Sequence, residues 1–369
     1  MTVGFDAVPL GSGHMIRGIG RYLTGILEAL LRERPEWARE HLRLLVAGDQ
    51  SSGTTAFWRT RRSPFRRQDL DWLTSALFDR LAVRAAPPSA WHTTDPWTPF
   101  STVSAARTIA TVYDLIPLTD PGAMVRIRPH RRLIYRRYLR SLKEARLVVA
   151  ISQTTADDVA TQLGIARDRI HVVYPSILPP PAGHQMAEQF GSRLDLLFVG
   201  VPEPHKRPDL VLQVLAELSR RRMDAHVTLV GPHPLKDRAA LEALASDLDV
   251  TARVRFLGPV GDAELIRLYR TSITLAVSRV EGFGLPPVEA LLAGGRVVAT
   301  PSRIYHEVLA STATFAASDD PGAVADAVLS VHAADRRGDL SSVRDLAERY
   351  GPRNAAASLV AAYEAVLYS

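Results

Sequence analysis

Short apolar runs alternate with amphipathic stretches along most of the chain. The apolar runs have the length of buried strands, whereas the stretches between them repeat apolar side chains at helical spacing. In the first half the pattern predicts strands over residues 2–8, 42–47, 108–113, 147–151 and 171–174, and helices over 21–31, 131–146 and 152–163, the last capped by Ser152 or Thr154. In the second half it predicts strands over 194–199, 225–230, 254–257, 273–277 and 296–299, and helices over 208–220, 237–248, 262–270 and 287–293. Such alternation is typical of a parallel sheet covered by helices on both faces.

A proline-rich segment separates the two halves. Pro175 is followed by three consecutive prolines at 179–181, and such a run continues neither a helix nor a central strand. We therefore expect an α/β protein with two Rossmann-like, doubly wound domains, over residues 1–180 and 194–351, joined by a linker over 181–193. Ligands of such sheets bind outside the carboxyl ends of the strands, so two domains that face each other would enclose a cleft.

The amino-acid composition indicates which classes of protein this chain can belong to. Of the 369 residues, 46% are hydrophobic and 23% are charged, which is typical of a globular protein. The absence of cysteine excludes disulfides and thiolate metal sites. No apolar run approaches the roughly 18 residues of a membrane-spanning helix, and the N-terminus lacks the basic lead of a secretory signal. We expect a cytoplasmic protein.

The net charge of +6 is unevenly spread. Residues 1–183 hold 25 Lys+Arg against 16 Asp+Glu, whereas residues 184–369 hold 20 against 23. A basic first half could face anionic lipid or a phosphorylated substrate. It carries no nucleic-acid reading motif, so no nucleic-acid partner is expected. The only lysines are Lys143, Lys206 and Lys236, so arginine is the ordinary surface cation of this chain.

The stretch VEGFGLPPVEA, at residues 280–290, directly follows a predicted strand. Its two prolines suit the first turn of a helix, where a missing N–H costs nothing. Gly282 and Gly284 allow the backbone to bend and to approach a ligand closely. The N–H groups of Phe283, Gly284 and Leu285 would then point out of a helix N-terminus, which is a ready site for an anion.

Two carboxylates, Glu281 and Glu289, flank this expected anion site. Each acid alone would be interpreted as a solvated surface residue. Together with the glycines and prolines, they are placed to accept hydrogen bonds from hydroxyl groups on either side of a bound anion. A nucleotide-sugar has this layout, because its diphosphate lies between the hydroxyls of a sugar and those of a ribose.

A second loop, within LFVGVPEPHKRPDL at residues 197–210, also leaves a buried strand and enters a helix. The strand ends at Gly200, and the helix is predicted to begin near Pro208. Lys206 lies in this loop, and its compact ammonium suits a point contact with a phosphate. Both loops are thus expected at the carboxyl edge of one sheet.

Together these motifs resemble the retaining glycosyltransferases of family GT4, which have the GT-B fold. EGFGLPPVEA resembles the family's two-glutamate motif without a gap, and FVGVPEPHKRPDLVLQVL resembles its phosphate loop. Further similar stretches follow in the family's order: GIGRYLTGILEAL (18–30), TVYDLIPLTDP (111–121), AISQTTADDVATQLGI (150–165), VRFLGPVGDAELIRLYRTS (254–272) and VVATPSRIYHEV (297–308). The last helix, over about 352–369, resembles the family's tail, which crosses back to pack on the first domain.

The resemblance implies a role for each residue of the motifs. Glu289 would hold the ribose hydroxyls of the donor, and Glu281 would contact the donor sugar. Lys206 and the amides of residues 283–285 would bind the diphosphate, so Lys206 and Glu281 are the expected catalytic residues. Gly18 and Gly20 would let a loop of the first domain approach the same phosphates.

The resemblance also implies that neither a metal nor a cofactor is required beyond the nucleotide-sugar. Two Asp-Leu-Asp stretches, at 69–71 and 247–249, have the spacing of a metal clamp. Both fall in predicted helices, so we interpret them as solvated helix faces.

The sequence departs from the family pattern at two places in the expected site. Many members carry an arginine in the phosphate loop, at places where this chain has Val201 and His205. His205 or Arg207 would then supply the second phosphate contact. Many members also read His-Asp where this chain has Tyr113-Asp114. Tyr113 would either bind a different or 6-deoxy sugar, or pack as a core aromatic.

The expected function is retaining transfer of a hexosyl group from a UDP-, GDP- or dTDP-sugar to a hydroxyl acceptor. The acceptor would be a polysaccharide, a lipid-linked glycan or a small natural product. The alternatives are a non-catalytic nucleotide-sugar-binding subunit and a GT-B nucleotide-sugar epimerase, which needs no acceptor. The basic segments 59–67 and 131–146 could make a weak contact with the inner face of a membrane, as in a peripheral cytoplasmic protein.

Overall fold

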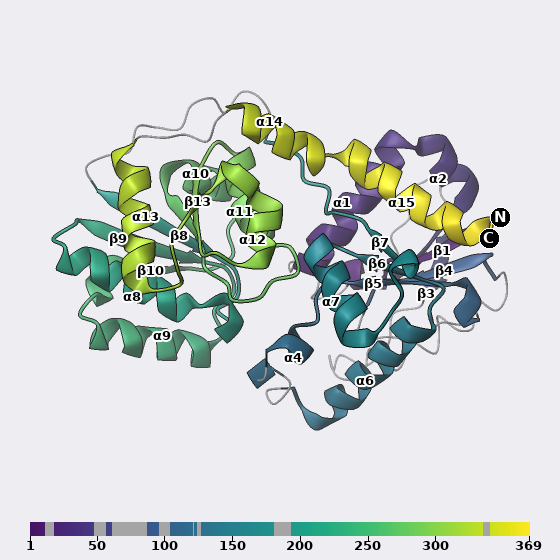
Figure 1. The fold of residues 1–369 in the computed structure, drawn as a ribbon, viewed down its shortest axis with the longest axis horizontal. Helices are drawn as coiled ribbons and strands as arrows, with labels where there is room; N and C mark the ends of the chain where they lie inside the picture. Colours follow the sequence, from purple (N-terminus) through teal and green to yellow (C-terminus); the bar gives the residue numbers. More distant parts are fainter. Residues whose placement is uncertain are drawn as a thin grey trace. The chain divides into compact units, whose positions relative to one another are not determined.

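The computed structural model describes residues 1–11, 18–47, 57–60, 87–95, 104–120, 122–123, 127–180, 193–334 and 340–369. The chain divides into two compact units. The first contains Met1–Ile177 and Tyr350–Ser369, and the second contains Leu178–Arg349 (Figure 1). Each unit is built on one parallel sheet, so the predicted fold class, with two doubly wound parallel sheets, is confirmed.

The sheet of the first unit has the strand order β3-β2-β1-β4-β5-β6-β7, and all of its pairs are parallel. The strands are β1 (Val3–Asp6), β2 (Leu42–Ala47), β3 (Phe57–Thr60), β4 (Ala90–Thr93), β5 (Thr108–Val112), β6 (Leu147–Ala150) and β7 (Ile170–Val172). The helices are α1 (Gly18–Glu33), α2 (Pro35–His41), α4 (Ile116–Thr119), α6 (Pro129–Glu144), α7 (Gln153–Leu163) and α15 (Pro352–Leu367), with 3₁₀ turns at Val8–Gly11, Ala105–Arg107 and Arg167–Arg169. The strand order reverses between β1 and β4, which is the switch point of this sheet.

The sheet of the second unit has the strand order β10-β9-β8-β11-β12-β13 and is also parallel throughout. The strands are β8 (Leu194–Val199), β9 (Ala225–Val230), β10 (Val254–Leu257), β11 (Ile273–Ala276), β12 (Arg296–Ala299) and β13 (Thr314–Phe315). The helices are α8 (Pro208–Arg220), α9 (Leu235–Asp247), α10 (Asp262–Thr271), α11 (Leu285–Leu292), α12 (Arg303–Leu309), α13 (Pro321–Ala333) and α14 (Leu340–Arg349), with 3₁₀ turns at Pro204–Lys206 (η4), Thr251–Arg253 and Ala310–Thr312. Here the order reverses between β8 and β11.

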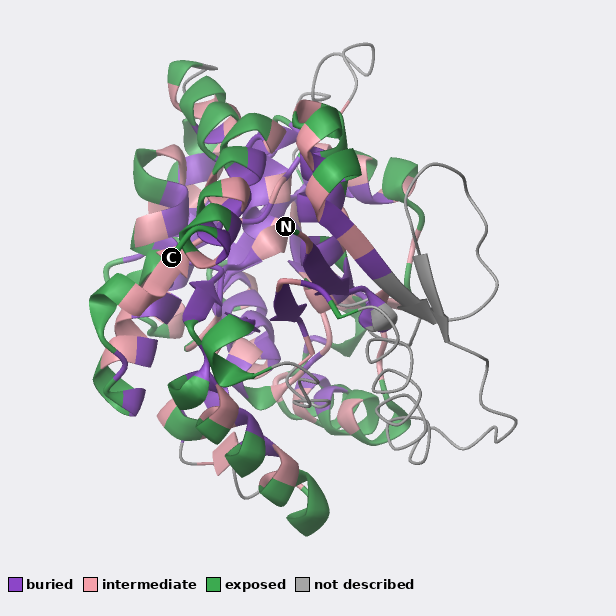
Figure 2. Ribbon diagram, turned by 90° about the vertical axis from the view of Figure 1, so that its right-hand side faces the viewer, coloured by how far each residue is buried: buried purple, intermediate pink, exposed green. Residues whose placement is uncertain are grey.

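Burial of apolar side chains explains why these segments fold as they do. In the second unit, β8 contributes Leu194, Leu196 and Phe198 to a core that also receives leucines and valines from α8 and α13. Strands of a parallel sheet are covered on both faces, so their sequences read as continuous apolar runs. Figure 2 faces the first unit and shows buried strands there, with helices whose outer faces are exposed.

Several predicted elements match the structure to the residue, among them β2, β8, α8, β9, β10 and β12. Ser152 caps α7, because its hydroxyl accepts a hydrogen bond from the amide of Thr155. The predicted start of the first helix, at residue 21, was wrong: α1 begins at Gly18. Its apolar face packs against α15 (Figure 1), and this tertiary packing outweighs the low helix propensity of two glycines. The following elements were not predicted: β3, β4, β13, α2, α4, α12, α13 and α14.

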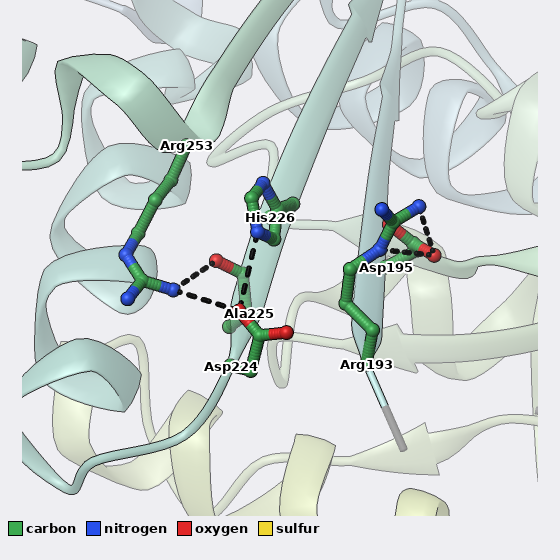
Figure 3. A network of polar contacts seen from close by, with 6 residues as sticks. All are labelled: Arg193, Asp195, Asp224, Ala225, His226 and Arg253. Atoms are coloured by element: carbon green, nitrogen blue, oxygen red, sulfur yellow. Dashed lines mark hydrogen bonds and ion pairs between the residues drawn. The ribbon is translucent and has the colours of Figure 1, made fainter. Parts of the chain in front are cut away.

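The amino edge of the second sheet carries a polar network at the starts of its strands. Arg193 bonds to Asp195 of β8, and Arg253, just before β10, donates to Asp224 and to the carbonyl of Ala225 (Figure 3). The side chains of Asp195, Asp224 and Arg253 are about a third exposed or more. These pairs are therefore exposed surface contacts of small energetic value.

The last helix, α15, is anchored to the first unit through a buried histidine. His92 of β4 is fully buried, and its Nδ1 lies 2.9 Å from the hydroxyl of Tyr363 on α15. Its Nε2 lies 2.7 Å from the hydroxyl of Thr111 on β5. Trp37 of α2 stacks on the ring of Tyr363 at 5.6 Å. The strands β4 and β5 and the helices α2 and α15 therefore meet around the contact between His92 and Tyr363.

This arrangement predicts a loss of stability in acid. Burial lowers the pKa of His92 from 6.5 to about 3. Below pH 6.5 the unfolded state binds a proton that the folded state does not, so stability falls as the pH falls. The loss between pH 8 and pH 5 is about 2 kcal/mol from this group. Urea unfolding at pH 8 and pH 5 measures this loss of unfolding free energy. The loss should be smaller in His92→Gln than in the wild type by about that amount. Equal losses of unfolding free energy in the wild type and in His92→Gln would show that His92 does not cause the acid sensitivity.

Candidate active site at the carboxyl edge of the second sheet

The predicted site residues of the second unit lie in two loops that leave neighbouring strands. The loop after β8 carries Lys206, and the loop after β11 carries Glu281. These strands pair directly, with Ile273 opposite Leu196 and Thr274 opposite Leu197. Their carboxyl ends lie at the switch point of the sheet, where α/β proteins commonly bind ligands.

An ion pair joins the two loops. Lys206, at the end of η4, places its Nζ 3.1 Å from Oε1 of Glu281. The same oxygen accepts a hydrogen bond of 3.0 Å from the hydroxyl of Ser278. The Lys206 and Glu281 side chains are only 23% and 16% exposed, so both charges are largely removed from water. The loops also share a backbone bond, because the amide of Arg279 donates to the carbonyl of His205 at 2.7 Å.

The surroundings of Glu281 hold it in the ionised form. Burial by itself raises the pKa of Glu281, but the positive charge of Lys206, with His205, and the hydrogen bonds from Lys206 and Ser278 lower it below its ordinary value. Tyr305 of α12 lies beside the same group. Burial, together with the charge of Glu281, raises the pKa of Tyr305 above its ordinary value, so its phenol stays neutral. Around Glu281 the site thus combines the ammonium of Lys206, the carboxylate itself and the neutral hydroxyl groups of Ser278 and Tyr305.

Two glycines shape the loops. Gly200, directly after β8, has a φ of 146°, which favours glycine, and the end of the Lys206 side chain lies 3.7 Å from where its Cβ would be. Gly284 has a φ of 86° and forms the N-cap of α11. A Cβ there would lie 3.1 Å from the ring of Tyr305. Both positions therefore need a residue without a side chain.

The second acid of the motif lies two residues further into α11 than predicted. Because α11 begins at Leu285, Glu289 stands on its second turn and is half-buried. Its Oε2 accepts a hydrogen bond of 2.9 Å from the hydroxyl of Tyr269 on α10. Gly282 and Phe283 are buried in the preceding loop, and the amides of Gly284 and Leu285 lie at the N-terminus of α11. The structure thus joins Lys206 directly to Glu281 and fixes Glu289 through a separate contact.

The two residues expected to replace the missing arginine are engaged elsewhere. Arg207 adopts a left-handed φ of 55° and pairs with Asp209 at 3.3 Å and with Asp319 at 3.1 Å. Its guanidinium would have to leave both carboxylates to reach a phosphate. His205 is buried, with its Nε2 3.5 Å from Oε2 of Glu203.

The remaining predicted residues lie in the first unit. Gly18 and Gly20 form the first turn of α1 and do not belong to a loop, which corrects their expected placement. Tyr113 is buried, and its hydroxyl donates to the carbonyl of Thr94 at 2.7 Å. A sugar hydroxyl would have to replace that bond. Asp114 accepts a hydrogen bond from the amide of Ile116 at the start of α4.

The metal-clamp candidates do not form a site in the described part of the chain. Asp69 and Asp71 lie outside the described residues. The stretch 247–249 was predicted to lie in a helix: Asp247 is the last residue of α9, whereas Asp249 lies beyond the helix with a φ of 56°. Among the described residues, no three histidine or acidic side chains gather as they would around a metal ion. Likewise, none of the described helices combines the length and the apolar character needed to cross a membrane.

Comparison with known proteins places the chain in a family. The family described as Glycosyl transferases group 1 matches residues 185–344, and the family described as Glycosyltransferase Family 4 matches residues 16–177. The chain belongs to glycosyltransferase family 4. The two matches cover the whole second sheet and every strand of the first except β1, and the predicted resemblance is confirmed.

Individual relatives are similar to only part of this family 4 chain. The O-antigen chain mannosyltransferase RfbU of Salmonella typhimurium is 25% identical over 57% of this chain and 56% of its own length. The D-inositol 3-phosphate glycosyltransferase of Frankia alni is 38% identical over 36% of each chain. The matches thus span about a half or less of these curated relatives.

A solved structure covers the whole fold. Anabaena HepE, crystallised with UDP and glucose, aligns over 98% of both chains with a TM-score of 0.71 and 16% identity. At that identity the likeness shows the fold, which is GT-B.

Three site residues of this family 4 chain were missed in the sequence. Ser278 comes two residues after β11, so its place at the carboxyl end of a strand could have indicated it. Tyr269 and Tyr305 lie on helices among apolar residues, and their pattern predicts core packing. Only the folded chain brings their hydroxyls beside Glu289 and Glu281.

The ion pair predicts energetic coupling between its two members. Lys206→Met leaves a largely buried carboxylate without its cation and should cost about 1–3 kcal/mol of unfolding free energy. Adding Glu281→Gln should recover part of that loss, which a double-mutant cycle measured by urea unfolding detects.

The exposed pair Arg238–Glu242, at 2.7 Å with both side chains nearly half exposed, is the matched control. Its coupling energy should be no more than about 0.5 kcal/mol. Additive effects of the changes at 206 and 281 would contradict the buried ion pair.

Proposed function

We propose that this protein transfers a sugar from a nucleoside-diphosphate sugar to a hydroxyl acceptor. The observation that carries the proposal is the placement of Lys206 and Glu281, 3.1 Å apart, at the carboxyl ends of the adjacent strands β8 and β11. The membership in glycosyltransferase family 4 supports it, as does the fold shared with Anabaena HepE, whose crystals contain UDP and glucose.

The site offers a partner for each part of such a donor. The ammonium of Lys206 and the amides at the N-terminus of α11 suit the diphosphate, because both present positive electrostatic potential. Glu281, kept ionised beside Lys206, suits the hydroxyls of the donor sugar. Glu289 suits the hydroxyls of the ribose. His205 and Arg207 remain candidates for a second phosphate contact, which for Arg207 requires release from Asp209 and Asp319.

Charge development determines what these residues do in the reaction. Cleavage of the anomeric bond leaves an oxocarbenium-like sugar and a nucleoside diphosphate with additional negative charge. Lys206 and the α11 N-terminus stabilise that charge with groups already oriented in the folded protein. The acceptor attacks the face from which the phosphate leaves, so the configuration at the anomeric carbon is retained. The leaving phosphate accepts the proton of the acceptor, and the reaction requires no metal.

The acceptor is a hydroxyl compound that binds to the first unit. The names of the relatives, an O-antigen mannosyltransferase and D-inositol 3-phosphate glycosyltransferases, support acceptors that range from glycans to small polyols. Gly18, Gly20, Tyr113 and Asp114 lie in that unit and stay candidate substrate contacts. The donor carries one of the nucleoside diphosphates UDP, GDP and dTDP, which a comparison of their binding distinguishes.

The helix α6 supports a weak contact with an anionic membrane surface. Its exposed residues include Arg131, Arg136, Arg137, Arg140 and Lys143, against one exposed acid, Glu144. Leu133, which is 63% exposed, lies on the same helix. Cationic helices with exposed apolar side chains bind the headgroup region of anionic bilayers. The protein would then act at the cytoplasmic face of a membrane.

The proposed chemistry predicts that Lys206→Ala slows sugar transfer far more than it perturbs folding. The donor is first identified by thermal shift, because a ligand at 100 times its Kd raises stability by about 2.7 kcal/mol. With that donor, Lys206→Ala should lower kcat by about 10²–10³-fold, since it removes one preorganised charge. Lys236→Ala, which removes an exposed lysine of α9, is the matched control and should leave kcat unchanged.

Three further results of the same assay test the rest of the scheme. An unchanged rate in Lys206→Ala would remove that residue from the mechanism. Turnover of the donor into its epimer without an acceptor would favour an epimerase. NMR of the product should show the anomeric configuration of the donor, and EDTA should leave the rate unchanged.

The membrane contact predicts charge-dependent binding to vesicles. At low salt the protein should float with vesicles that contain phosphatidylglycerol and not with pure phosphatidylcholine vesicles. Changing Arg136, Arg140 and Lys143 to glutamate should abolish flotation. The same change at Arg220, Arg238 and Arg267, in the second unit, alters the net charge equally and should not. Failure of the unmodified protein to float would contradict the contact.

A further inference from the structure

Tyr269 has a buried hydroxyl that is directed at one of the site carboxylates. It lies on α10, is 2% exposed, and donates a hydrogen bond of 2.9 Å to Oε2 of Glu289 on α11. The two residues are 20 positions apart and belong to different helices. A phenol whose ring is enclosed by the core has few alternative positions for its hydroxyl. The direction of this bond is therefore fixed by the fold.

The backbone of Tyr269 is also fixed in position, because the turn at Gly295 packs against it. A Cβ at Gly295 would lie 2.1 Å from the carbonyl oxygen of Tyr269 and 2.9 Å from that of Ala290. The turn after α11 thus packs closely against the end of α10, and only glycine fits at that position. The donor of the hydrogen bond and the helix that carries its acceptor are therefore locked to each other at two points.

A fixed bond to one oxygen determines how the whole carboxylate of Glu289 is presented. A glutamate side chain has several rotatable bonds, and holding it in one orientation costs conformational entropy. Recognition of two neighbouring hydroxyls requires the carboxylate in one plane and at one depth. A hydrogen bond that exists before the ligand arrives removes that cost from binding.

We propose that Tyr269 is the positioning residue for recognition of the donor's ribose, because it presets the carboxylate of Glu289. The inference rests on the proposed function, in which Glu289 binds the ribose hydroxyls. Tyr269 itself contacts neither the ribose nor the reacting atoms. It makes the site selective for ribonucleotides over analogues that lack the 2′ and 3′ hydroxyls.

The test compares the affinities of two ligands by isothermal titration calorimetry. One is UDP or GDP, whichever stabilises the wild type more, and the other is its 2′,3′-dideoxy form. A wild type that binds only dTDP would overturn the inference, because dTDP lacks the 2′ hydroxyl. In Tyr269→Phe the Kd of the ribonucleotide should rise about tenfold, since a bond to a charged group is lost, while the Kd of the dideoxy form stays unchanged. Glu289→Gln should lose the preference as well. The double variant should resemble Glu289→Gln alone, because the phenol acts only through that carboxylate.

Tyr363→Phe is the matched control, because it also removes a buried phenol hydroxyl, one that lies 2.9 Å from His92 in the first unit. It should lower stability and leave the ribose preference unchanged. A full ribose preference in Tyr269→Phe, together with its loss in Glu289→Gln, would overturn the inference and leave the proposed function intact. An equal rise in the Kd of both ligands in Tyr269→Phe would also overturn the inference and leave the proposed function intact. If the wild type binds no nucleoside diphosphate, the proposed function fails, and this inference fails with it.

Discussion

The contact between Lys206 and Glu281 is the constraint on which the rest of the site depends. Two opposite charges, each largely withdrawn from water, stand 3.1 Å apart on loops that leave neighbouring parallel strands. Each charge stabilises the other, since an unpaired buried charge is more costly than a paired one. The pair therefore joins the two loops and holds the ammonium of Lys206 at the switch point of the sheet. A diphosphate carries more negative charge than one carboxylate and can compete for the same ammonium.

The residues around the pair form a supporting layer. Ser278 shares the carboxylate oxygen with Lys206, and the carbonyl of His205 holds the second loop through the amide of Arg279. Tyr305 packs against Gly284 and stays neutral beside Glu281, while Tyr269 orients Glu289 from another helix. The loops thus supply Lys206, Glu281 and Ser278, whereas the helices behind them supply the hydroxyls of the two tyrosines. This division keeps the chemistry on short, bent segments while the orientation comes from the packed core.

The sequence predicts what depends on local pattern. The strands β8, β9 and β10 were predicted to the residue because each is a short, mostly apolar run that ends directly before a glycine. Lys206 and Glu281 were predicted because each lies in a loop that follows a strand, and lysine is rare in this chain. Glu289 was predicted because it ends the same glycine- and proline-containing stretch as Glu281. The pairing of Arg207 with Asp319, 112 positions away, and the bond from Tyr269 to Glu289 depend on tertiary packing, which no local pattern encodes. The early start of α1 has the same cause, since its packing against α15 outweighs the glycines.

The central claim is that the Lys206–Glu281 pair marks the binding site of a nucleoside diphosphate. The most direct test is a crystal structure of the full chain in complex with that ligand. The account predicts that Nζ of Lys206 leaves Oε1 of Glu281 or shares it, and lies within about 3 Å of a phosphate oxygen. It also predicts the ribose hydroxyls at the carboxylate of Glu289. A nucleotide bound elsewhere, with the Lys206–Glu281 pair unchanged, would contradict it.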